Sequence, residues 1–415
     1  MGGEWIECTL ADACGSIDYG LTASASDHEA GPRFLRITDI VSGHINWKAV
    51  PHVAADHEAT EKYRLHHGDV VLARTGASTG ASAYVQNPPP AVFASYLVRL
   101  KARPEFDSRF LAYYLKSEDF WRFIRGVLGD KSAQPNASAS TMTKAPLRAP
   151  RDKNEQRAIA HILGTLDDKI ELNRRMSEAL EAMARALFKS WFVDFDPVRA
   201  KMEGRDPGLP KPLANLFPAR LVDSELGEIP EGWRVVKLGE LLELAYGKAL
   251  KAEARREGKI PVYGSNGQVG WHDERLVAGP GIVVGRKGNP GVVTWVPTDF
   301  FPIDTTFYVV PKAKCGSLVF LFHVLRTHDL GSLGGDSAVP GLNRNLVYMS
   351  DQVLPPAPLL AQFEGITSAL LRRVGSMVNE SRTLAALRDA LLPKLISGEL
   401  RVKDAERFLA RKGES

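Results

Sequence analysis

Apolar side chains recur at alternating steps of three and four from about Lys153 to Phe192, which predicts one long helix. The two rows of this stripe are Leu163, Ile170, Ser177, Ala184 and Trp191, and Ile159, Leu166, Asn173, Leu180 and Leu187. The spacing is close to the heptad of a coiled coil, in which a buried polar pair such as Asn173 and Ser177 would fix the register. The stripe far exceeds the average helix of roughly 11 to 12 residues, which argues against an ordinary helix lying on the surface of one domain.

A second stripe of the same layout lies near the C-terminus. Its rows are Phe363, Leu370, Met377, Leu384 and Leu391, and the less regular Thr367, Val374, Ser381, Arg388 and Leu395. At one constant offset Ser177 matches Ser381 and Leu187 matches Leu391, and each stripe follows prolines and carries a glutamine, Gln156 or Gln362, near its start. We therefore expect the two helices to pack on each other in antiparallel directions.

The segments that precede the two helices are also repeated. Trp5 and Leu10 match Trp233 and Leu238, and GDVVLARTG (68–76) matches PGIVVGRKG (280–288). Each of the last two segments is a short apolar run, then a basic residue, then a turn with glycine. This order predicts a buried strand that delivers Arg74 or Arg286 to a loop.

The chain thus alternates between globular domains and long helices. We expect a first domain at 1–150, a central helix at 151–200, a proline-rich connector at 201–230, a second domain at 231–355, and a C-terminal helix and tail at 356–415. This is an α+β fold with a pseudo-twofold internal repeat, in which two mixed α/β domains are separated by two long antiparallel helices that form a coiled-coil-like spacer.

Composition narrows the function classes. The 415 residues are 44% hydrophobic and 25% charged, which is typical of a folded protein, and the net charge of +4 permits a polyanionic partner without requiring one. No apolar run is long enough to span a membrane and the first residues lack the features of a signal peptide, so we expect a cytoplasmic protein. Cys8, Cys14 and Cys315 form no CxxC pair, so we expect reduced thiols.

Several sequence motifs resemble those of one known protein family. The run ALFKSWFVDFDPVRAKMEGR (186–205), the later SELGEIPEGW and the C-terminal LLPKLISGEL closely resemble the DNA-specificity subunit of type I restriction-modification systems. The stretch IPVYGSNGQVG (260–270) and the strand followed by RxG resemble its target recognition domains. The resemblance extends over essentially the whole chain, and the connector motif is its most specific part.

The resemblance implies a DNA-binding subunit in which each globular domain recognises one half of a bipartite target in double-stranded DNA. It also implies partners, namely methyltransferase (modification) subunits, two by family analogy, and ATP-dependent restriction subunits. A helix of about 38 residues is roughly 57 Å long, and one turn of DNA is about 34 to 36 Å. The helix pair would therefore act as a ruler between half-sites roughly one turn apart.

Duplex recognition needs phosphate contacts and donors that reach base edges, and two classes of loop supply such side chains in both halves. The RxG loops contribute Arg74, Thr75, Ser78 and Thr79, and Arg286, Lys287 and Asn289. The polar loops before each helix contribute Ser132, Gln134 and Asn136, and Asn343 and Arg344. Ordinary surface turns would explain any one of these residues, but the repetition of Arg74 in Arg286 favours a shared role. Ser265 and Asn266 fit a hairpin turn better.

Aromatic residues crowd the end of the central helix, and they allow two interpretations. Trp191, Phe192 and Phe195 either cap a core or form a surface that binds the modification subunits, since aromatic anchors dominate interface energetics. The first is the commoner arrangement. The resemblance supports a docking role for the region without assigning it to a particular residue.

Motifs for catalysis, cofactors and metals do not emerge from the sequence. The NPPP at 87–90 lacks the aromatic residue of an adenine methyltransferase motif, no GxxxxGK[ST] is found, and His52, His57, His66 and His67 lack metal-ligand spacing. We therefore expect a non-catalytic subunit with no cofactor. The alternatives are a nuclease or methyltransferase with an unrecognised site, and an architectural or stand-alone DNA-binding protein that does not recognise sequence.

Overall fold

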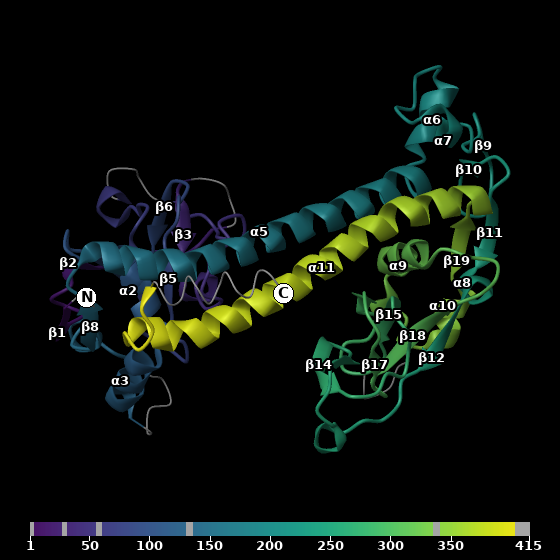
Figure 1. The fold of residues 1–415 in the computed structure, drawn as a ribbon. Coiled ribbons are helices and arrows are strands. Elements are labelled where there is room, and N and C mark those ends of the chain that lie inside the picture. The colour runs from purple at the N-terminus through teal and green to yellow at the C-terminus, as the bar shows by residue number, and fades with distance from the viewer. Residues whose placement is uncertain (1–3, 27–30, 55–59, 130–135, 335–340, 403–415) are drawn as a thin grey trace. The chain divides into compact units, whose positions relative to one another are not determined.

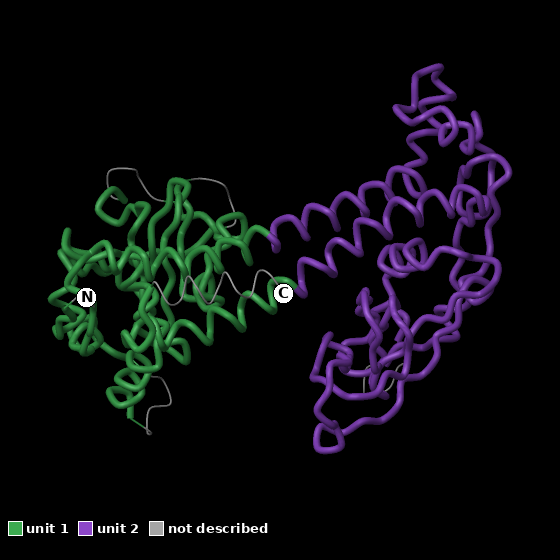
Figure 2. Tube along the Cα trace, viewed as in Figure 1, with its two compact units in different colours: residues 1–172, 380–415 green, residues 173–379 purple. Residues whose placement is uncertain are grey.

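The computed structural model describes residues 4–26, 31–54, 60–129, 136–334 and 341–402. The chain forms two compact units (Figure 2). Unit 1 comprises residues 1–172 and 380–415, and unit 2 comprises residues 173–379. Within the described residues no helix is both long and apolar enough to cross a membrane.

Unit 1 is built around a four-stranded antiparallel sheet (Figure 1). Its order is β2 (Cys14–Tyr19), β7 (Leu97–Ala102), β4 (Val70–Ala73) and β5 (Ser82–Tyr84). Smaller pairs are β1 (Trp5–Thr9) with β8 (Pro146–Pro150), antiparallel, and β3 (Arg33–Leu35) with β6 (Ala91–Phe93), parallel. The short helices are η1 (Ile37–Asp39), η2 (Glu61–Tyr63), α2 (Ser108–Tyr114), α3 (Glu118–Leu128) and α4 (Ala139–Met142).

Unit 2 repeats this plan. Its antiparallel sheet has the order β12 (Leu242–Tyr246), β18 (Thr306–Pro311), β15 (Gly281–Gly285) and β16 (Val293–Val296). β11 (Arg234–Lys237) pairs with β19 (Asp351–Leu354), and β9 (Leu221–Val222) pairs with β10 (Ile229–Pro230). β13 (Ile260–Gly264) pairs in parallel with β17 (Phe301–Pro302) and in antiparallel with β14 (Gly267–His272). The short helices are α6 (Asp196–Met202), α7 (Lys211–Ala214), α8 (Leu238–Leu241), η3 (Ala252–Ala254), α9 (Leu318–Thr327), η4 (Leu330–Ser332) and α10 (Arg344–Met349).

The internal repeat is therefore structural as well as sequential. β1 with β8 corresponds to β11 with β19, and the four-stranded sheets have the same order of equivalent strands. The matched leucines behave alike, because Leu10 and Leu238 are both fully buried and their N–H groups bond to Ala145 and Ser350 at equivalent places. These observations confirm the predicted α+β fold with two repeated mixed α/β domains.

The two predicted long helices are α5 (Lys153–Phe192) and α11 (Ala357–Ile396), each of 40 residues. In unit 1 the first half of α5 packs on the last half of α11, where Asp167 bonds to Arg388 and Lys169 pairs with Glu380. In unit 2 Ser177 lies against Met377 and the ring of Phe188 lies 6.2 Å from that of Phe363. Early residues of one helix thus meet late residues of the other, which confirms antiparallel packing within each unit.

The two glutamines near the helix starts do not have the same role, although the sequence pairs them. Gln156 is buried, accepts a hydrogen bond from the N–H of Asp107 and donates to the carbonyl of Pro150. Gln362 is exposed, and Glu364 takes the corresponding place by accepting from Ser317 and from the N–H of Val319 at the start of α9. In each unit the long helix holds the start of a short helix, but by different residues.

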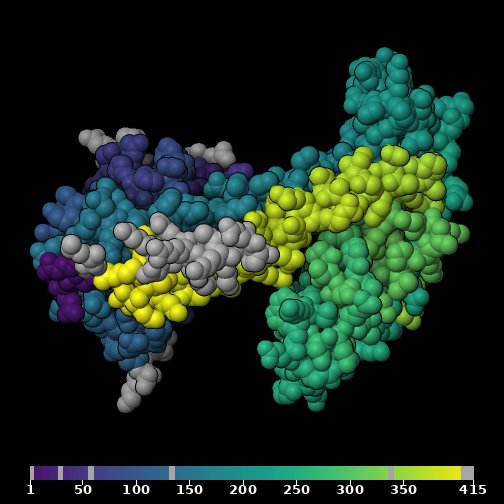
Figure 3. Space-filling view, viewed as in Figure 1, coloured from purple at the N-terminus to yellow at the C-terminus, as the bar shows by residue number. Residues whose placement is uncertain are grey.

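The core of unit 2 contains the aromatic cluster. Trp191, Phe192 and Phe195 are all buried, and their rings contact Phe217, Phe363 and Trp233. Their assignment to partner binding is therefore corrected, because buried rings present no surface for docking. They cap a core, which was the other interpretation of the sequence. By contrast, Ile366 and Val378 on α11 are exposed, and the space-filling view shows the surface of this helix uncovered over that stretch (Figure 3).

Candidate nucleic-acid interface

In unit 1 a buried strand ends at an arginine. Every residue of β4 is buried, and Arg74 follows directly as the first residue of a loop. The loop is fixed by the backbone, since the N–H of Arg74 donates to Tyr96 and its carbonyl accepts from Ala137. Gly76 has a φ of +77°, a conformation that favours glycine, so the turn depends on it. The predicted delivery of Arg74 by a strand is confirmed.

Unit 2 builds the same loop after β15. The N–H of Arg286 donates to Thr305 and its carbonyl accepts from Leu342. Bridges of the β type join Thr75 to Asn136 in unit 1 and Lys287 to Gly341 in unit 2. The two classes of polar loop that are far apart in the sequence thus lie side by side in each unit, where they form one surface.

Each loop arginine lies over a tyrosine ring. The guanidinium carbon of Arg74 is 5.1 Å from the ring centre of Tyr19, and that of Arg286 is 5.1 Å from the ring centre of Tyr246. Arg344, from the second loop of unit 2, lies 4.9 Å from the same ring. Both tyrosines are about half exposed, at 45% and 51%. This cation–π contact restrains the position of each guanidinium over its ring.

The described part of the chain does not use the donors of these two arginines. Among the described residues no hydrogen bond or ion pair engages the guanidinium of Arg74 or Arg286, and Nε of Arg74 is buried without an acceptor. Arg99 shows the opposite situation, because its guanidinium bonds to Asp18 and to the carbonyls of Arg64 and Lys62. Arg99 therefore has a structural role, whereas Arg74 and Arg286 are equipped to donate to a ligand.

The other predicted contact residues fall into four groups. Lys287, Asn289 and Asn136 are exposed at the loops, and Thr75 and Ser78 are half-buried beside them. Thr79 is a correction, because it is only 2% exposed and its hydroxyl donates to the carbonyl of Gly76 within the turn. The side chain of Asn343 accepts from the N–H of Asn345 as the cap of α10, and Ser132 and Gln134 lie outside the described residues.

The tyrosines were missed by sequence reasoning, although a signal exists. Each is the last residue of the first strand of its sheet and is followed by glycine, as Tyr19-Gly20 and Tyr246-Gly247. A Cβ on Gly20 would lie 2.3 Å from the carbonyl oxygen of Ala94, and one on Gly247 would lie 2.2 Å from that of Ile303. The backbone approach therefore requires glycine in both halves, and the repeated Tyr-Gly pair marks the ring positions.

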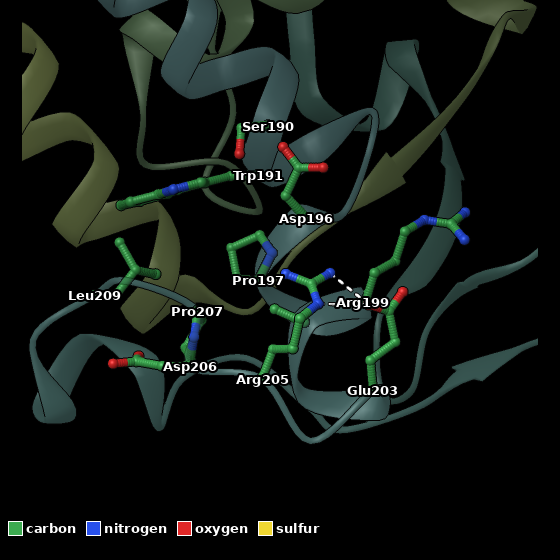
Figure 4. A pocket seen from close by; sticks show the side chains of 11 residues that line it. Ser190, Trp191, Asp196, Pro197, Arg199, Glu203, Arg205, Asp206, Pro207 and Leu209 are labelled. Carbon is green, nitrogen blue, oxygen red and sulfur yellow. Dashed lines mark hydrogen bonds and ion pairs between the residues drawn. The ribbon is translucent and has the colours of Figure 1, made fainter.

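A separate pocket lies in the connector of unit 2 (Figure 4). It has a volume of about 300 Å³ and lies between the end of α5, α6 and the segment up to Leu209. Arg205 points along its wall but donates to Glu203 at 2.6 Å, so the two charges satisfy each other. Within the described part of the chain no group of three or more His, Cys, Asp or Glu side chains is placed to hold a metal ion.

The comparison with protein families decides what kind of surface the two loops form. The model of the "Type I restriction modification DNA specificity domain" matches residues 29–182 and 230–344, more than half of the chain. The chain belongs to this family. Both matched segments contain a loop arginine and its neighbours, Arg74 in the first and Arg286 in the second. As a type I specificity subunit, the chain is a DNA-recognition component and not itself a catalyst.

Relatives of this specificity subunit extend over most of its length. The chain is 26% identical over 321 residues to the type I restriction enzyme MjaIX specificity subunit of Methanocaldococcus jannaschii, covering 72% of this chain and 70% of the relative. It is 24% identical to the HindI specificity subunit of Haemophilus influenzae, covering 96% and 100%. The crystal structure of the S subunit from M. genitalium has the same fold, with a TM-score of 0.61 at 18% identity over 95% of this chain and 96% of that one.

Proposed function

We infer that each unit of this specificity subunit recognises one half of a split DNA target. The observation that carries the proposal is the repeated pair of loops, each with an arginine held on a tyrosine and with unused donors. Arginine is the commonest side chain for specific contacts to bases, and Lys287 and Asn289 beside it suit phosphate contacts. α5 and α11 are continuous through both units, so helices rather than flexible segments join the two reading surfaces. Linking two recognition surfaces in one chain raises the effective concentration of the second half-site once the first is bound.

The test of this function is a map of methylated bases in the host genome, with the gene intact and with it deleted. We expect a motif of two short fixed blocks around an unspecified gap to lose adenine methylation on deletion. An unchanged map, together with equal affinity of the purified complex for all duplex sequences, would support an architectural role instead. DNA cleavage or methylation by the purified chain alone would support a catalytic one.

The two loop arginines should act on different half-sites. Replacing Arg286 by alanine removes the donors of one unit only, so recognition of one block should weaken by about 1 to 3 kcal/mol while the other block stays intact. Arg74→Ala should have the reciprocal effect. The measurement is competition binding with targets scrambled in one block at a time.

A matched control for this prediction is Arg256→Ala in unit 2. Arg256 is exposed, whereas the loop arginines are half-buried, and its guanidinium bonds to Asp273 and Glu274. Its loss should leave the preference for both blocks unchanged. If Arg286→Ala and Arg74→Ala alter the same block, or neither, the assignment of one half-site to each unit is wrong.

We also propose a surface for the modification subunits on α5. Within unit 2 the exposed side of this helix carries Met176, Ala179, Met183 and Ala186 at steps of three and four. These residues form a second heptad stripe, separate from the face that packs on α11. The small alanine side chains leave space between the flexible methionines into which side chains of a partner helix could pack. A helix of a partner subunit would fit such a stripe. Recruitment of restriction subunits would follow once this complex has formed.

Replacing Met183 by glutamate should weaken binding of the modification subunits about tenfold or more, because a charge would be buried in an apolar seam. Met183 is 56% exposed, so the free chain should unfold at the same denaturant concentration as before. The measurement is titration of the modification subunit by calorimetry. The control is Met349→Glu, which alters a methionine on α10 that is 66% exposed. Equal weakening by both variants would remove the stripe from the proposal.

A further inference from the structure

Unit 2 holds two arginines on one aromatic ring. Arg286 and Arg344 lie 5.1 and 4.9 Å from the ring centre of Tyr246, and Arg286 is also 5.9 Å from that of Phe307. Among the described residues neither guanidinium has a carboxylate partner, and Arg344 makes only a long contact of 3.5 Å to the carbonyl of Leu244. Two like charges beside one ring repel each other, so the arrangement is suited to a ligand that offers hydrogen-bond acceptors to both guanidinium groups.

Unit 1 differs at the equivalent place. Among the described residues its ring, Tyr19, carries Arg74 alone, and the Tyr19 hydroxyl accepts a hydrogen bond from the N–H of Ala139. Ala139 is the first residue of α4, just as Arg344 is the first residue of α10. The repeat therefore places alanine in unit 1 where unit 2 has a second arginine. At this place the two units therefore differ in this one side chain, whereas both retain the two loops and the tyrosine ring.

We propose that Arg286 and Arg344 form a guanine-recognising clamp in the half-site bound by unit 2. Guanine presents two acceptors, O6 and N7, on its major-groove edge, and a guanidinium matches them with two parallel N–H groups. The contacts with Tyr246 restrain both guanidinium groups before DNA binds, which lowers the cost of ordering them for a bidentate contact to a base edge. The proposal rests on the proposed function, because it assumes that this surface faces the bases.

The experiment uses the complex of the full chain with its modification subunits and the DNA target found by the methylation map. Each guanine is replaced singly by 7-deazaguanine, which lacks the N7 acceptor. For the unaltered complex, substitution at one or two guanines in one block should weaken binding about 5- to 100-fold. In Arg286→Lys or Arg344→Lys the charge remains but the fork is lost, so the same substitution at the matching guanine should have little further effect.

Two controls separate the clamp from a general loss of binding. Arg326→Lys alters an arginine that stacks on Phe322 in the same unit, outside the loops, and should keep the full sensitivity to 7-deazaguanine. Tyr246→Phe retains the ring and should bind as before, whereas Tyr246→Ala should lose discrimination at the clamped guanine.

Three results would overturn the proposal. In the first, the target is recognised but no guanine couples to Arg286 or Arg344. In the second, both lysine variants keep full affinity and selectivity, which indicates contacts to phosphates. In the third, the unaltered complex does not distinguish its target from scrambled DNA, and then the proposed function fails as well. The first two leave that function standing.

Discussion

Replacing Phe363 by alanine should lower the free energy of unfolding of unit 2 by about 4 kcal/mol. Phe363 is fully buried at the point where α11 crosses α5, and its ring lies 5.0 Å from that of Phe192 and 6.0 Å from that of Trp191. The rings around it belong to several elements, so the cavity cannot collapse by a shift of one side chain. Loss of the ring removes both apolar burial and edge-to-face contacts.

The measurement is denaturant unfolding followed by the fluorescence of Trp191 and Trp233, which lie in the same core. Ile366→Ala, one turn further along α11 and 40% exposed, should change the free energy of unfolding by less than about 0.5 kcal/mol. If the two variants unfold at the same denaturant concentration, the packing of α11 on α5 in unit 2 contributes little to stability.

The second large effect is expected at Asp167 in unit 1. Its carboxylate accepts hydrogen bonds from Arg388 on α11 at 2.6 Å and from the hydroxyl of Tyr113 on α2 at 2.8 Å, and it lies 3.6 Å from Nζ of Lys116. Asp167→Ala would leave two cations and a buried hydroxyl without their common partner. We expect the free energy of unfolding of unit 1 to fall by about 2 to 3 kcal/mol.

The direction of the pH dependence follows from the same contacts. Burial raises the pKa of the Asp167 carboxyl, but Lys116, Arg388 and Tyr113 outweigh it and hold the pKa below the usual 3.8. Burial also lowers the pKa of Lys116. Because the folded state depresses the Asp167 pKa, its contribution to stability is complete well above pH 3.8 and is lost as the pH falls below that value.

Urea titrations at neutral pH and near pH 3 should therefore show a smaller difference between Asp167→Ala and the unaltered chain at the lower pH. Glu178→Ala is the control, since its pair with Arg174 lies on the surface of the same helix and is worth about 0.3 to 0.5 kcal/mol. An equal loss in both variants would mean that the Asp167 contacts are no stronger than a surface ion pair.

The features that could be predicted from sequence are those that depend on periodicity. Heptad spacing located α5 and α11, and the match between 68–76 and 280–288 located the strands that directly precede Arg74 and Arg286. The heptad spacing and the repeated segments can both be recognised in the sequence because the burial of a strand or a helix face constrains many neighbouring residues at once. Arg388 broke one heptad row for a physical reason, since it meets Asp167 across the helix pair.

The features that could not be predicted depend on which side chains meet across the fold. Tyr19 and Tyr246 contact the loop arginines only because β2 and β12 end beside the arginine loops. Trp191, Phe192 and Phe195 have the composition of an interface, and only the packing of unit 2 around them shows a core. Thr79 was chosen for its hydroxyl, and the turn uses that hydroxyl internally.

The division of the chain into units also has a consequence for its synthesis. Unit 2 is one continuous segment, whereas the core of unit 1 includes Leu391, Leu395 and Ile396 from the end of α11. Domains generally fold as they leave the ribosome, N-terminal first. In this chain the synthesis of unit 2 is complete at residue 379, while unit 1 still lacks residues 380–415 and with them the last turns of α11. A stop codon shortly after residue 379 would therefore leave unit 2 complete and would remove part of the core of unit 1.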